Sequence, residues 1–164
     1  MDYEQIRVRA KRHVDKLNLP RPLTVNTLHQ SMEDLRGKRI LISPAGPNMI
    51  EQGICGLWIE IAGEDFERIH YAPTSSAVHR QQFINHEFGH MILAHEKQLV
   101  AAERVALLAP LIPLDAIAYA LARSSFTDEQ ELLAEAIGDQ LAVTILRDSE
   151  VPDRSDLAGF GRIL

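Results

Sequence analysis

The sequence predicts a single α+β domain in which a small three-stranded antiparallel sheet packs against helices. Three observations predict it. Apolar residues recur every three or four positions up to about residue 36, short β-rich runs bounded by turn residues follow up to residue 71, and helical spacing returns from about residue 76. Because helices flank the strands instead of alternating with them, an α+β arrangement is favoured over a doubly wound one.

The N-terminal part is expected to form two helices and then three strands. The first helix covers residues 3 to about 17, and the second begins at an N-cap, Thr24, and stops at Gly37. The predicted strands cover residues 39–43, 54–61 and 66–71. Residues 62–65 contain a glycine and join the last two strands as a hairpin.

The C-terminal part is expected to be helical. One helix runs from residue 76 or 77 to about 96, and two shorter helical segments, 99–108 and 114–123, are separated by prolines. The last long helix begins after an N-cap at Thr127 and ends near Arg147.

The boundaries follow from these elements. The chain has 164 residues, which suits one hydrophobic core. We expect one domain over residues 1–147 and a C-terminal tail over residues 148–164 that is partly disordered.

Composition narrows the classes of function. The net charge of −6 argues against direct nucleic-acid binding, which usually needs a basic face. The chain opens on acidic residues without an apolar leader, and no run approaches the roughly 18 apolar residues of a membrane span. A soluble cytoplasmic protein is therefore expected. Its single cysteine, Cys55, lies in an apolar stretch and is expected to be a small buried side chain.

The segment HEFGH, residues 86–90, predicts a metal site. Two histidines four residues apart, His86 and His90, lie on one face of a helix and can direct their rings at one ion. Glu87 follows the first of them, where it can take a proton from a water activated by zinc. The neighbouring apolar residues predict a largely buried helix, and burying these polar side chains is costly unless they bind something. Gly89 leaves room for a strand or a substrate to approach.

A third zinc ligand should come from another segment. His95 does not fit, because it points about 140° away from His90 on a helix, so a capping or supporting role is expected for it. The last helix carries Glu131, Glu135 and Asp139 at intervals of four, with small residues beside them. Either Glu131 with Glu135, or Glu135 with Asp139, would provide a ligand and a second carboxylate that supports a ligand histidine.

The run from residue 80 to residue 95 resembles the active-site helix of the ImmA/IrrE family of metallopeptidases. The hairpin before it is similar as well, and residues 36–44 resemble the first strand of the actinobacterial branch. Residues 131–138, ELLAEAIG, match the family's later glutamate-rich helix, with Leu133 in place of its second glutamate. The resemblance covers roughly residues 36–147 and favours Glu131 as the ligand, with Glu135 as the alternative.

The resemblance implies a zincin-like fold and a cytoplasmic, zinc-dependent endopeptidase of the glutamate-zincin type. It implies a protein substrate, a helix-turn-helix regulator of the xenobiotic-response-element type, in prophage, stress or toxin–antitoxin regulation. Tyr71 and His95 are candidates for stabilising the oxyanion. A zincin-fold binding module that acts through protein–protein interaction is the alternative, and a metal-dependent hydrolase of non-peptide bonds is a third possibility.

Overall fold

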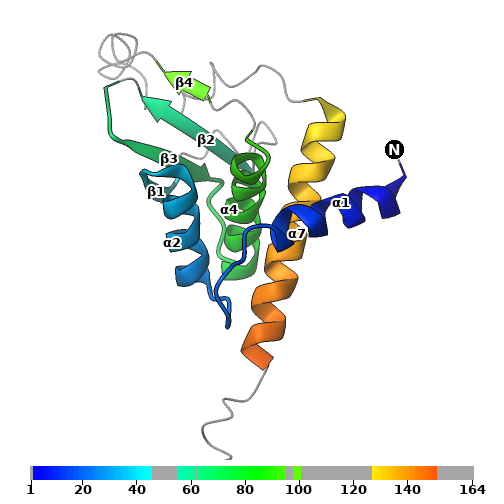
Figure 1. The fold of residues 1–164 in the computed structure, drawn as a ribbon. Helices are drawn as coiled ribbons and strands as arrows, with labels where there is room; N and C mark the ends of the chain where they lie inside the picture. The colour runs from blue at the N-terminus through cyan, green and yellow to red at the C-terminus, as the bar shows by residue number, and fades with distance from the viewer. Residues whose placement is uncertain (1, 46–54, 62, 95–97, 101–126, 151–164) are drawn as a thin grey trace, which may run out of the picture.

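A computed structural model describes residues 2–45, 55–61, 63–94, 98–100 and 127–150 of the chain. In this part of the chain, four helices lie beside and below one mixed sheet, so the predicted α+β class is confirmed (Figure 1). The helices are α1 (Tyr3–Asp15), α2 (Val25–Arg36), α4 (Ala77–Ile92) and α7 (Asp128–Glu150). The strands are β1 (Arg39–Pro44), β2 (Gly56–Ile61), β3 (Phe66–Tyr71) and β4 (Gln98–Val100).

The helix ends form where the sequence carries capping residues. Thr24 is the N-cap of α2 and accepts from the backbone N–H of Thr27, as predicted. Gly37 closes the same helix with φ 64°, a left-handed conformation that glycine adopts without steric cost. Ser76 caps α4 in the same way as Thr24 caps α2. These local signals position α4, which carries the HEFGH segment.

The sheet differs from the prediction in the direction of its strands. The described strands have the order β1-β3-β2-β4, and of their pairs only the hairpin pair β2–β3 is antiparallel. β1 runs parallel to β3 and β4 runs parallel to β2. The prediction of a purely antiparallel three-stranded sheet was therefore wrong, although its hairpin is confirmed. The apolar pattern of a strand reports which face is buried, not the direction of the strand beside it.

The structure also corrects the expectations for residues 98–100 and for Cys55, and it extends the last helix. Residues 98–100, where a helix was expected to begin at Leu99, pair with β2 as a strand. Cys55, expected to be buried, is exposed, because it lies just before β2 begins. α7 continues to Glu150, beyond the predicted end near Arg147. The remaining residues of the predicted 99–108 helix, the 114–123 helix, residue 95 and residues 151–164 lie outside the described residues.

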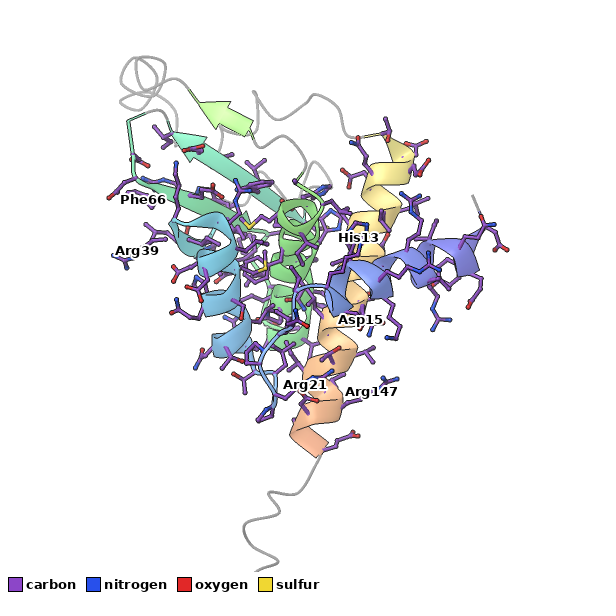
Figure 2. The ribbon with its side chains drawn as sticks, viewed as in Figure 1. His13, Asp15, Arg21, Arg39, Phe66 and Arg147 are labelled. Carbon is purple, nitrogen blue, oxygen red and sulfur yellow. The ribbon has the colours of Figure 1, made fainter. Side chains whose placement is uncertain are left out.

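α4 lies in the middle of the molecule, with α2 and the sheet on one side and α7 on the other (Figure 1). The apolar side chains that lie between these elements form the hydrophobic core. Figure 2 shows side chains filling the space between the helices and the sheet. Its largest fully buried members include Leu28, Met32, Ile69, Phe88 and Ile137. α1 crosses α7 on the outside and adds Ile6, Ala10 and Val14 to the same core. Among the described helices, none has the length and apolar character that a membrane span requires.

Candidate metal centre

The HEFGH segment forms the C-terminal part of α4, so its two histidines lie one turn apart on the same face, as predicted. The rings of His86 and His90 meet edge to face, with centroids 4.8 Å apart. Their Nε2 atoms are 3.1 Å apart. His90 is buried, whereas the side chain of His86 is 29 % exposed. Both rings therefore present a nitrogen to one point at the edge of the core.

α7 brings a carboxylate to the same point. Glu131 lies with Oε2 3.3 Å from His86 Nε2 and Oε1 3.6 Å from His90 Nε2. In the described part of the chain, His86, His90 and Glu131 form a group of donors that could hold a metal ion. The predicted alternatives on the same helix, Glu135 and Asp139, are exposed and do not belong to this group.

The spacing of these three donors fits a tetrahedral metal. Ligand atoms bound to zinc at about 2.0–2.1 Å lie about 3.3 Å from one another at tetrahedral angles. The two histidine nitrogens lie 3.1 Å apart, close to that value. Each has a different oxygen of the Glu131 carboxylate beside it, Oε2 at 3.3 Å from His86 and Oε1 at 3.6 Å from His90, and one ligand atom from each residue lies within 4.8 Å of the other two. Two imidazoles and one carboxylate are also a donor set that catalytic zinc accepts, with a fourth position left open. The residues present could therefore hold a metal ion.

Two small residues allow α7 to come this close to α4. A Cβ added to Gly89 would lie 2.3 Å from the backbone oxygen of Ala134. A Cβ added to Gly138 would lie 3.1 Å from the backbone nitrogen of His86. Small residues were predicted where this helix packs on the metal helix, and they lie there. The segment that approaches Gly89 is another helix, not the strand or substrate that the sequence suggested.

Glu87 is buried beside the donor group and has an altered acidity. Burial is the main cause that raises its pKa to about 7, and the charge of Glu131 adds to the increase. The neighbouring His86 and a hydrogen bond from the backbone N–H of Trp58 act in the opposite direction on this pKa. A carboxyl group with such a pKa can accept and release a proton near neutral pH.

The same group of charges changes the pKa of His86. Burial alone would lower its pKa, but the hydrogen bond with Glu131 and the negative charges of Glu87, Glu131 and Glu135 outweigh that effect. The net result is a raised pKa of the His86 imidazole. A site that draws positive charge onto a histidine in this way also attracts a metal cation.

Sequence analysis did not single out the contact of Glu87 with the first residues of β2. A Cβ at Gly56 would lie 2.5 Å from Oε1 of Glu87. A glycine at the start of a strand often marks such a close approach, so a signal was present. Of the two suggested oxyanion donors, Tyr71 packs against the hydrophobic core and His95 lies outside the described residues.

Comparisons of the chain with protein-family models, with curated proteins and with solved structures find no match. What this site can do chemically therefore rests on its geometry and its residue types.

Proposed function

We propose that the protein is a zinc-dependent endopeptidase of the glutamate-zincin type, with the zincin-like active-site arrangement of the ImmA/IrrE family that its sequence resembles. The observation that supports this most is the convergence of His86, His90 and Glu131 beside a buried Glu87. A site that only stabilises the fold does not need a carboxylate beside its ligands, whereas peptide hydrolysis needs a base there.

In this proposal the histidines and Glu131 hold the metal, and Glu87 moves the proton. A bound zinc ion supplies a Lewis acid that polarises a peptide carbonyl and lowers the pKa of water toward about 7. Glu87 would accept a proton from the water that attacks the peptide carbonyl and would return it to the amine that leaves when the C–N bond breaks. Because the side chains of His86 and Glu131 are 29 % and 45 % exposed, a polypeptide can reach the site from solvent.

The substrate class is proposed from the resemblance. It is a helix-turn-helix transcriptional regulator, which the endopeptidase cleaves, and neither nucleic acid nor membrane is needed for that reaction. The net charge of −6 agrees with a protein that does not bind nucleic acid directly.

Zinc titration of ligand variants tests the metal site. The purified protein should bind about one zinc per chain, and Glu131→Ala should weaken zinc binding by more than about 100-fold, because it removes a ligand and not merely a supporting residue. Glu135→Ala is the matched control, since it removes the same charge one turn away on α7; it should weaken zinc binding by less than about tenfold. Equal losses in the two variants would contradict the assignment of Glu131.

Glu87→Gln tests the catalytic step separately from the metal. This variant should keep the zinc content of the wild type and lose cleavage of a helix-turn-helix regulator by at least about 100-fold, since it cannot accept a proton. Retention of full activity by Glu87→Gln would reject the endopeptidase and leave a binding module as the better account.

A further inference from the structure

The start of β2 lies against the carboxylate of Glu87 at a point where no side chain fits. A Cβ built on Gly56 would lie 2.5 Å from Oε1, 3.0 Å from Cγ and 3.1 Å from Cδ of Glu87. Cβ atoms in proteins do not approach other heavy atoms to 2.5 Å, so any residue but glycine would force the carboxylate or the strand to move. Glu87 is buried, and the three atoms that the added Cβ would meet all belong to its side chain, so the carboxylate is the group that would have to move.

The same stretch of β2 also provides a hydrogen-bond donor. The backbone N–H of Trp58 donates to the Glu87 carboxylate. β4 pairs with β2 only from Ile59 to Ile61, so among the described strands the edge from Gly56 to Trp58 has no neighbour on that side. A backbone N–H that none of the described strands uses can donate to a side chain.

We propose that Gly56 is a positioning residue for Glu87. The bare backbone at Gly56 lets the carboxylate lie flat against β2, and the Trp58 N–H then holds it in one orientation beside His86. An alanine at position 56 displaces the carboxylate from that donor. Its role in placing a catalytic base rests on the proposed function, whereas the contact itself does not.

A double-mutant cycle tests the contact through the unfolding midpoint. Gly56→Ala should lower the midpoint by roughly 3–10 °C in the wild-type background, the range expected for overpacking in a domain of this size. In the Glu87→Ala background the added methyl group enters the space that the carboxylate has left. There the same substitution should change the midpoint by less than about 2 °C. Equal losses in the two backgrounds would overturn the proposal.

The double variant of this cycle and one further variant keep the test decisive. Should Gly56→Ala alone not fold, recovery of a folded protein by Gly56→Ala/Glu87→Ala supports the proposal, and failure to recover overturns it. Gly56→Ala/Glu87→Asp, with a carboxylate shorter by one methylene, should regain at least half of the loss in midpoint caused by Gly56→Ala. No recovery in this variant counts against a clash with Glu87.

Zinc content and cleavage separate this proposal from the proposed function. Gly56→Ala should bind one zinc per chain, as its three ligands are intact, and should cleave a helix-turn-helix regulator at least about tenfold more slowly than the wild type. Wild-type rates in Gly56→Ala would overturn the positioning role. If the wild type cleaves nothing, the endopeptidase fails, and the unfolding cycle still decides whether Gly56 positions Glu87.

Discussion

At the scale of single residues, a carboxylate with no exposed surface joins the sheet to α2. Glu67 on β3 is 0 % exposed and accepts hydrogen bonds from the guanidinium of Arg36, at 2.9 Å from Nη2, and from Trp58 Nε1 at 2.7 Å. The Arg36 guanidinium also lies 4.9 Å from the centroid of the Trp58 ring. These contacts join the last residue of α2 to the two central strands.

Removing the Arg36 guanidinium should therefore destabilise the folded protein. Arg36→Ala should lower the free energy of unfolding by about 3–5 kcal/mol, because it removes the guanidinium that pairs with a fully buried carboxylate. Arg68→Ala is the matched control, since Arg68 pairs with Glu64 in the hairpin, where both side chains are about a quarter exposed; its cost should be at most about 1 kcal/mol. Denaturant titration measures both, and similar losses would refute the importance of burial at Glu67.

At the same scale, the sequence predicted which side chains form the site, but it did not predict which residues from other elements pack against them. The spacing of His86, Glu87 and His90 identified the metal face of α4 from local geometry alone. Gly56 is distant in sequence from Glu87. The residues next to Gly56 in the sequence therefore do not indicate that the Glu87 side chain packs against it. Cys55 illustrates the reverse error, because apolar neighbours predicted burial at a position that the chain leaves exposed before β2.

At the scale of elements, the crossing of α4 and α7 determines which carboxylate meets the histidines. The i, i+4 spacing puts Glu131 and Glu135 on one stripe of α7, so periodicity alone cannot choose between them. The contact of Gly89 with the backbone of Ala134 sets how α7 lies across α4, and it brings Glu131 to the rings. The direction of β1 and β4 was likewise not predictable, because it depends on how distant segments pair.

This crossing predicts a difference between two glycines. Gly89→Ala should lower the unfolding midpoint by roughly 4–10 °C and weaken zinc binding, because its Cβ would meet backbone at 2.3 Å and push Glu131 away from the histidines. Gly138→Ala is the control on the partner helix. Its Cβ would meet backbone at 3.1 Å, a small displacement that is offset by the better helix propensity of alanine, about 1 kcal/mol. Calorimetry and zinc titration would contradict this account if Gly138→Ala lost as much as Gly89→Ala.

At the scale of the whole molecule, the N-terminal segment holds α7 near both of its ends. Arg9 of α1 pairs with Glu129 at 2.8 Å near the start of α7. Near its end, Asp148 accepts from Arg21 at 2.6 Å and from the backbone N–H of Leu23, and Figure 2 shows Arg21 beside this part of the helix. The sequence placed residue 148 in a tail that contains Pro152, Gly159 and Gly161, residues that interrupt helices. The contacts with residues far away in the chain explain why the helix continues to Glu150.

This link should make stability depend on pH. The backbone N–H of Leu23, and then Arg21, lower the pKa of the Asp148 carboxyl in the folded protein below its ordinary value. A lowered folded-state pKa stabilises the protein above the ordinary aspartate pKa of about 4, and this contribution is lost as pH falls through the folded pKa. Asp148→Asn should therefore lower the unfolding midpoint at pH 7, and its midpoint should converge with that of the wild type in acid. Asp139→Asn removes the same charge from an exposed position on α7 and should leave the midpoint unchanged at pH 7. If the unfolding midpoints of Asp148→Asn and the wild type differed by the same amount at every pH, the contact would stabilise α7 without a contribution from the carboxylate charge.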